Sequence, residues 1–182
     1  MSRFDPVRKS NCNQTQELFL NLIGEKYGRV PNFFATIAHS PVTAASFTNH
    51  SQTLGEQSSL TTEEIEAIAL SQAVYHGCPY CTSAHSNIAK NKGVSKDEIY
   101  SFMNFTSSSN KIQQLIKFTN AINVNRGKVN TDDIERFLSS GYSIQNMVDV
   151  VAIIAINVFT NYTNLIFETD VDFPSISSID QD

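Results

Sequence analysis

The sequence predicts a single all-α domain, and three observations support this fold class. The 182 residues include only seven glycines and five prolines, and this scarcity of helix breakers favours long helices over a turn-rich β fold. Helix start signals recur along the chain, where a capping residue or a proline precedes apolar residues at helical spacing. Because no repeat or linker interrupts this pattern, we predict one domain over residues 1–182.

The first five predicted helices, taken in chain order, begin at capping or proline signals. Asn13 caps the first helix, and a proline in the first turn begins the second, third and fifth, where the missing N–H group costs nothing. Thr61 and Glu64 form a capping box at the fourth, in which each side chain binds the other residue's backbone amide. These helices are predicted over residues 14–28, 31–37, 41–55, 62–77 and 79–92.

The later helices follow polar breaks in the sequence. Ser95 and Glu98 match a second capping box. The β-branched segment 148–156 is also compatible with one buried strand, but the length of the apolar pattern around it favours a helix. The later helices are predicted over residues 96–105, 111–126, 131–139 and 144–168.

Charge and hydropathy exclude several classes of partner. The chain has 13 basic and 18 acidic residues and no cluster of Lys and Arg, so we expect no nucleic-acid partner. The acidic tail, residues 168–182, is expected to be solvated and without function. The first ten residues lack an apolar signal segment, and the apolar run 147–159 is shorter than the ~20 residues of a membrane-spanning helix. We therefore expect a cytoplasmic protein that does not bind membranes.

The reactive side chains gather in a core motif within residues 60–100. Three cysteines in a cytoplasmic chain indicate chemistry rather than structural disulfides. Cys81 falls in the first turn of its predicted helix, where free backbone amides and the helix dipole stabilise a thiolate. Cys78 lies three residues earlier and can form a disulfide with an oxidised Cys81.

Two further residues complete a candidate proton relay. His85 lies four residues after Cys81 and therefore on the same helix face, where an imidazole can take the thiol proton. Glu66 lies about 16 Å before the end of its helix, and His85 about 10 Å into the next one, at 1.5 Å per residue. If these two helices pack antiparallel, the carboxylate and the imidazole come within side-chain reach.

The cysteine motif has other interpretations. His76, Cys78, Cys81 and His85 could hold zinc in a non-catalytic helical assembly module, although four ligands around one helix start would be strained. The same cysteines could serve a disulfide reductase or a redox sensor that does not turn over peroxide efficiently. A thioredoxin-like fold is disfavoured because the segment before Cys78 is predicted to be helical, not a strand.

The pattern Glu66-x11-Cys78-x2-Cys81-x3-His85 resembles the carboxymuconolactone decarboxylase superfamily, specifically its alkyl hydroperoxide reductase D (AhpD)-like, peroxidase-related branch. Two positions differ from relatives: Tyr80 stands where AhpD has a histidine, and Leu165 follows Asn164 where related long members often have a histidine. Other similar segments are residues 30–33, 40–41, 159–164 and 170–174.

The resemblance implies an all-helical fold with a central antiparallel helix pair that carries the Glu and the CxxC-x3-His motif. It also implies a homo-oligomer, commonly a trimer or hexamer, and a thiol-dependent peroxidase without haem, metal or other cofactor. In that assignment Cys81 attacks an organic hydroperoxide, Cys78 resolves the sulfenate, and Glu66 with His85 relays the proton. The decarboxylases of the superfamily lack the cysteine pair. The resemblance does not identify the thiol or dithiol reductant, and the asparagines at 157, 161 and 164 receive no role.

Overall fold

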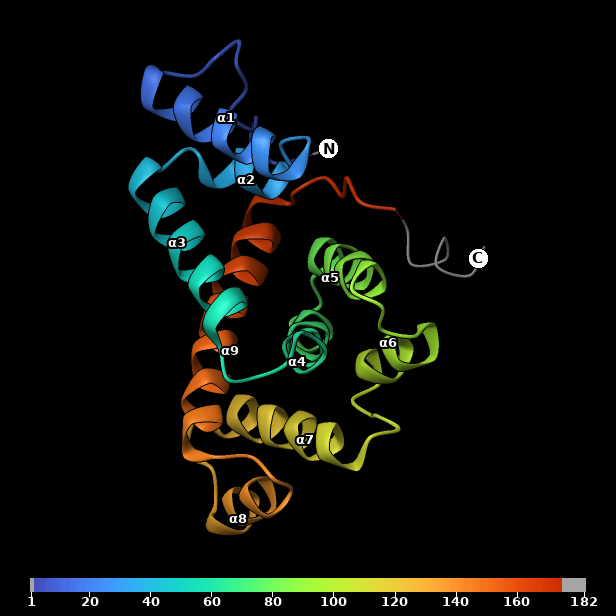
Figure 1. Cartoon of the computed structure of the whole chain (residues 1–182). Coiled ribbons are helices and arrows are strands. Elements are labelled where there is room, and N and C mark those ends of the chain that lie inside the picture. The colour runs from blue at the N-terminus through green and yellow to red at the C-terminus, as the bar shows by residue number, and fades with distance from the viewer. Residues whose placement is uncertain (1, 175–182) are drawn as a thin grey trace.

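The computed structural model describes residues 2–174, and all regular elements in this range are helices (Figure 1). The all-α prediction is confirmed, and each predicted helix lies within two residues of its expected ends. The strand considered for residues 148–156 is wrong, because this segment lies inside the last helix. The helices are α1 (Gln14–Tyr27), α2 (Asn32–Ile37), α3 (Pro41–Gln57), α4 (Thr62–Tyr75), α5 (Pro79–Asn91), α6 (Lys96–Met103), α7 (Asn110–Asn125), α8 (Thr131–Ser139) and α9 (Ile144–Phe167).

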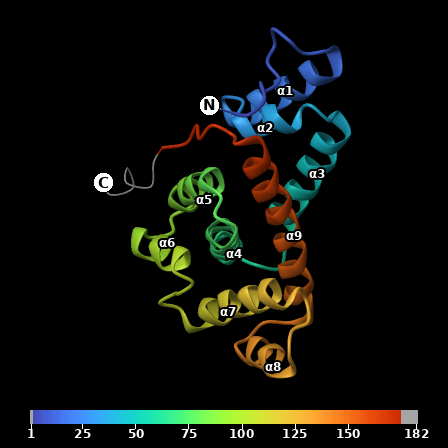
Figure 2. The ribbon, with the colours of Figure 1, turned by 180° about the vertical axis from the view of Figure 1, so that it is seen from behind.

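Helix α4 is the centre of the fold, with α5, α6, α7 and α9 packed around it (Figure 2). Its residues 66–73 are all buried, because neighbouring helices cover every side of it. Ile68 contacts a core formed with α7, α8 and α9, while Leu70 faces a second core formed with α5, α6 and α7. This burial fixes α4, and the site described below lies where α4 passes into α5.

The capping box predicted at the start of α4 is present. Thr61 N donates to Glu64 Oε2 at 2.8 Å, and Glu64 N donates to Thr61 Oγ1 at 3.2 Å. The second predicted box is only half formed. Ser95 caps α6, but the Glu98 carboxylate instead accepts hydrogen bonds from Ser107 and Ser108. The loop before α7 offers Glu98 several donors, whereas a capping box would offer it one.

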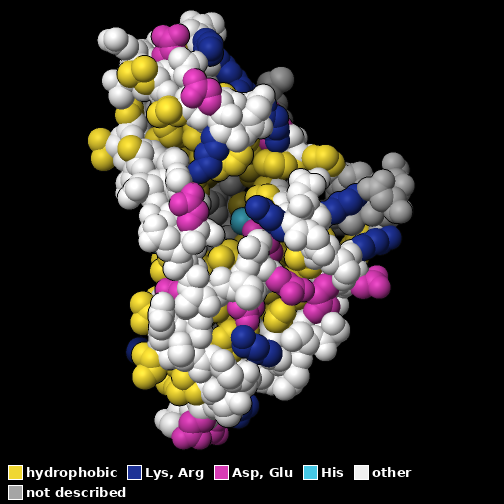
Figure 3. All heavy atoms as spheres, viewed as in Figure 1, with side chains coloured by type: hydrophobic (Ala, Val, Ile, Leu, Met, Phe, Trp, Pro, Cys, Tyr) yellow, Lys and Arg dark blue, Asp and Glu magenta, His cyan; other side chains and the backbone are white. Residues whose placement is uncertain are grey.

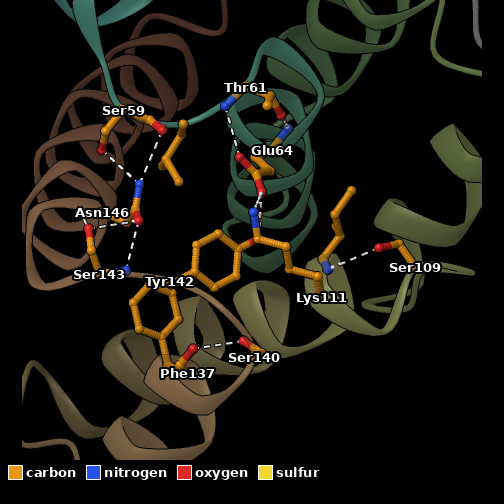
Figure 4. Close-up of polar contacts among 12 residues, drawn as sticks. Ser59, Thr61, Glu64, Ser109, Lys111, Phe137, Ser140, Tyr142, Ser143 and Asn146 are labelled. Carbon is orange, nitrogen blue, oxygen red and sulfur yellow. Dashed lines mark hydrogen bonds and ion pairs between the residues drawn. The ribbon is translucent and has the colours of Figure 1, made fainter.

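Glu64 also joins α4 to distant parts of the chain (Figure 4). Its Oε1 accepts a hydrogen bond from Tyr142 Oη at 2.9 Å and lies 3.0 Å from Lys111 Nζ. Burial raises the pKa of Glu64, but the Thr61 amide, Lys111 and Tyr142 outweigh this and hold it below its usual value. The charged carboxylate therefore links α4 to α7 and to the loop before α9.

Helix α9 carries the most apolar sequence in the chain. Its 24 residues are long and apolar enough to cross a membrane by length and composition alone, unlike the shorter run considered from the sequence, and no other helix within residues 2–174 passes this test. One face, with Val150, Ile153 and Ile154, is buried in the core. The opposite face exposes an outer stripe whose members lie three, four or, in one place, seven residues apart. It is formed by Ile144, Val148, Val151, Ala155, Tyr162 and Ile166.

The segment after α9, residues 168–174, forms a C-terminal strap that runs from the end of α9 towards α5 (Figures 1 and 2). The expectation that its acidic residues are simply solvated is wrong for this described part of the acidic tail, because they bind partners from the N-terminal region. Residues 175–182 lie outside the described range. Glu168 pairs with Arg3, Asp172 pairs with Arg29, and Asp170 accepts a hydrogen bond from the amide of Ser2.

Candidate active site

The turn between α4 and α5 positions the two cysteines. Gly77 has φ +66°, a left-handed conformation that lets the chain reverse directly after α4. The amide of Cys78 then donates to Ala73 O at 2.9 Å, which closes the end of α4. Cys78 is the N-cap of α5 and Pro79 occupies its first turn, as predicted.

Cys78 and Cys81 form a disulfide, with Cα atoms 5.4 Å apart. The amide of Cys81 donates to Cys78 Sγ at 3.2 Å, while Cys81 Sγ accepts a hydrogen bond from Asn164 Nδ2 at 3.4 Å. The sequence predicts that the free amides of the helix terminus stabilise Cys81. The structure differs, because the N-cap side chain faces the free amides of a helix start. Cys81 instead receives its donor from α9.

Glu66 and His85 meet between α4 and α5. Glu66 Oε2 lies 2.8 Å from His85 Nδ1, the pairing expected for two antiparallel helices. Glu66 is 5% exposed, and a buried carboxylate needs such a partner. Since Nδ1 is held by Glu66, Nε2 is the ring nitrogen left for a reactant.

Cys81 and His85 line an aromatic pocket of about 380 Å³. Figure 3 shows a hollow in this face of the molecule, bordered by hydrophobic side chains and with a histidine inside. The pocket combines a sulfur and an imidazole with aromatic walls, which suits an apolar reactant. Its aromatic walls are Tyr27, Phe33, Phe34, Phe47, Tyr80 and Phe173.

Tyr80, between the two cysteines, has a structural role here. Its hydroxyl accepts a hydrogen bond from the amide of Phe33 at 3.1 Å, and its ring packs edge-on against Phe173 of the strap at 5.6 Å. Burial raises the pKa of Tyr80, and the nearby Asp172 carboxylate raises it further. The raised pKa keeps the Tyr80 hydroxyl in its neutral form.

Asn164 is a site residue whose place the sequence did not reveal. It lies 83 positions after Cys81, and its Oδ1 is buried with no hydrogen-bond partner within residues 2–174. Asn157 and Asn161 differ, because their amides bond to backbone carbonyls one turn earlier in α9. Only Asn164 of this asparagine cluster hydrogen-bonds to the cysteine pair. The proximity of Asn164 to Cys81 depends on how α9 packs, and local sequence patterns carry no information about that packing.

The four residues considered for zinc do not form one cluster. Cys78 and Cys81 are joined to each other, and His85 pairs with Glu66. His76 ends α4 and packs against the Tyr162 ring at 5.1 Å, and burial lowers the pKa of this histidine. Among the described residues, no group of three or more His, Cys, Asp or Glu side chains is arranged to hold a metal ion.

An all-α fold with a CxxC pair beside a buried Glu–His pair defines a class of helical proteins that carry a dithiol, and comparisons with known proteins support the fold. Residues 41–121 match the carboxymuconolactone decarboxylase family. The chain is therefore similar to this family over residues 41–121, and it has the AhpD-like fold. No curated protein matches the chain.

Solved structures with this fold belong to proteins whose names describe different activities. A peroxidase-related protein from Ralstonia eutropha JMP134, described as an alkylhydroperoxidase AhpD core, has TM-score 0.84 and 20% identity over 94% of this chain and 92% of its own. A cysteine-to-alanine variant of the debrominase Bmp8, in complex with 2,3,4-tribromopyrrole, has TM-score 0.80 and 21% identity over 100% and 98%. A peroxidase-related protein from Silicibacter sp. TM1040 has TM-score 0.77 and 18% identity over 92% and 87%. Members of this fold family act as enzymes, and identities this low establish the fold alone.

Proposed function

We propose that the protein is a thiol-dependent peroxidase that reduces organic hydroperoxides. The observation that carries the proposal is the location of Cys81 in the aromatic pocket beside His85, whose ring is held by Glu66. The aromatic walls favour an organic hydroperoxide over hydrogen peroxide, because apolar groups gain free energy when they leave water.

The reaction follows from the groups present. The Cys81 thiolate attacks the terminal peroxide oxygen, the O–O bond breaks, and the alkoxide takes a proton from His85 to leave as an alcohol. Cys78 then attacks the sulfenic acid on Cys81, which forms the disulfide and releases water. Glu66 stabilises the charged imidazole and fixes its orientation. An external thiol or dithiol restores the cysteines, and the cycle needs no cofactor.

Three variants test this proposal with cumene hydroperoxide. We expect Cys81→Ser to abolish turnover and Cys78→Ser to leave a trappable sulfenic acid. Glu66→Gln is expected to slow the single-turnover loss of thiols by about 100-fold, the usual scale of general acid–base catalysis. Full peroxide turnover by Cys81→Ser would refute the proposal.

Reductive dehalogenation of a small aromatic ring is a second candidate, favoured by the aromatic lining and by the Bmp8 fold. The dithiol supplies the two electrons: a carbon–halogen bond is replaced by carbon–hydrogen, halide leaves, and the cysteines become a disulfide. Release of bromide from 2,3,4-tribromopyrrole by reduced wild-type protein, but not by Cys81→Ser, would support it.

A disulfide reductase or redox sensor is distinguished by faster reaction of the thiols with a small disulfide than with cumene hydroperoxide.

We further propose that the protein is a cytoplasmic homo-oligomer, a trimer or hexamer. The outer stripe of α9 supports this proposal. A row of exposed apolar side chains on one helix face is often an interface, and a second copy of the chain presents the same stripe.

A further inference from the structure

A second pocket opens beside the disulfide, on the side of Cys78. It has a volume of about 420 Å³ and is lined by Gly77, Cys78 and Pro79 together with the end of α9 and the strap. We call it the Cys78 pocket. Cys81 does not line it, whereas Cys81 but not Cys78 lines the aromatic pocket.

The two pockets share a wall. Asn164 and Tyr80 line both of them, so these side chains separate the approach to one sulfur from the approach to the other. Both are buried and held in place, Asn164 by Cys81 Sγ and Tyr80 by the amide of Phe33. A molecule in the Cys78 pocket therefore does not have to pass through the aromatic pocket.

We propose that the Cys78 pocket is the entry site of a thiol reductant, which attacks Cys78 Sγ rather than Cys81 Sγ. This inference rests on the proposed function only in that the Cys78–Cys81 disulfide forms during the catalytic cycle. It assigns separate sites to the oxidant, at Cys81, and to the reductant, at Cys78.

The exchange is balanced for a dithiol. One reductant thiolate attacks Cys78 Sγ, the S–S bond breaks, and the electron pair leaves on Cys81 Sγ, which the Asn164 amide stabilises. The second reductant thiol then attacks the mixed disulfide and releases Cys78. The reductant leaves as a disulfide, its two protons pass to the protein cysteines, and Cys81 is ready for the next oxidant.

Two variants at similarly exposed positions test whether the oxidant and the reductant use separate sites. Leu165 is 38% exposed and lines only the Cys78 pocket, whereas Ile88 is 37% exposed and lines only the aromatic pocket. Two half-reactions are measured by rapid alkylation and mass: reduction of the oxidised protein by dithiothreitol, and oxidation of the reduced protein by cumene hydroperoxide. Because exchange rates depend on access to the attacked sulfur, Leu165→Trp should slow reduction by about tenfold and leave oxidation unchanged.

Ile88→Trp should do the reverse, slowing oxidation and leaving reduction unchanged. Val171→Trp, in the strap part of the Cys78 pocket, gives a second test if Leu165→Trp does not fold. Unchanged reduction in a folded Leu165→Trp or Val171→Trp variant would overturn the proposal, as would equal slowing of both half-reactions. Failure of peroxide oxidation in the wild type would refute the proposed function, but the reduction measurement would still be decisive.

Chemical capture identifies the attacked sulfur directly. Oxidised protein is mixed with 2-mercaptoethanol, quenched with iodoacetamide and fragmented for mass spectrometry. We expect the mercaptoethanol adduct on Cys78 and the alkyl group on Cys81. The opposite placement would show that the reductant attacks Cys81, and the Cys78 pocket would then have no role in reduction.

Discussion

At the scale of single residues, the two cysteines differ in what stabilises them. Cys78 Sγ receives the backbone amide of Cys81, a donor that every helix start supplies to its N-cap. Cys81 Sγ depends on a side chain, the Asn164 amide, which arrives from a helix far along the chain. The reactivity of Cys81 can therefore be changed by substitution without disturbing the start of α5.

Asn164→Asp tests this dependence. A carboxylate beside Cys81 Sγ would replace an N–H donor by a like charge, so the pKa of the Cys81 thiol should rise. The pH dependence of iodoacetamide alkylation, measured in a Cys78→Ser background, reports this pKa directly. Asn164→Leu is the matched control, because it removes the donor without adding charge and should raise the pKa less. Identical profiles for both variants and the parent would contradict the role of Asn164.

Glu64 makes stability depend on pH. Its folded-state pKa lies below the unfolded value, so its contribution is fully present above the unfolded pKa, about 4.5, and is lost as pH falls through the folded pKa. Glu64→Gln should lose about 1.5–3 kcal/mol at pH 7, the scale of hydrogen bonds to a charged group. The loss should shrink as the pH falls below about 4. Urea unfolding at several pH values measures it, and a loss independent of pH would contradict the assignment.

At the scale of elements, caps and proline positions were enough to predict the helices, because such signals are local. The same holds for Glu66 and His85, whose meeting required only two neighbouring helices to pack antiparallel. The Glu98 carboxylate, Asn164 and Phe173 were not predictable in this way. Their partners come from another loop, helix or strap, and the β-branched run in α9 showed that local propensity alone leaves strand and helix open.

The turn between α4 and α5 provides a test at this scale. An alanine Cβ at Gly77 would meet no atom within 4 Å, so Gly77→Ala would introduce backbone strain rather than a clash. The left-handed conformation costs an alanine about 1–2 kcal/mol, and thermal or urea unfolding should show this loss. Gly55→Ala is the control: it also has open space, but it lies in α3 with an ordinary helical conformation. It should stabilise the protein by about 0.5–1 kcal/mol. A stabilising Gly77→Ala would contradict the role of this turn.

At the scale of the whole molecule, α9 has two functions that its sequence must satisfy together. Its inner face holds the core and delivers Asn164 to Cys81, while its outer stripe remains apolar and exposed. Core packing accounts for the first face only. If the outer stripe contacted only water, polar side chains would be tolerated there without loss of stability. Its apolar composition therefore favours contact with another surface.

Negative charge introduced into the outer stripe distinguishes contact with a second copy of the chain from contact with a membrane. Val148→Glu combined with Val151→Glu, at positions 64% and 51% exposed, should convert an oligomer to monomers in sedimentation or light-scattering measurements, because burial of an unpaired carboxylate is costly. The matched control is Leu18→Glu with Leu22→Glu on α1, 61% and 64% exposed and outside the stripe, which should leave the assembly intact. A wild-type monomer at micromolar concentration would contradict self-association. Flotation of that monomer with phospholipid vesicles, lost in the Val148/Val151 variant, would then identify the outer stripe as a membrane-binding face.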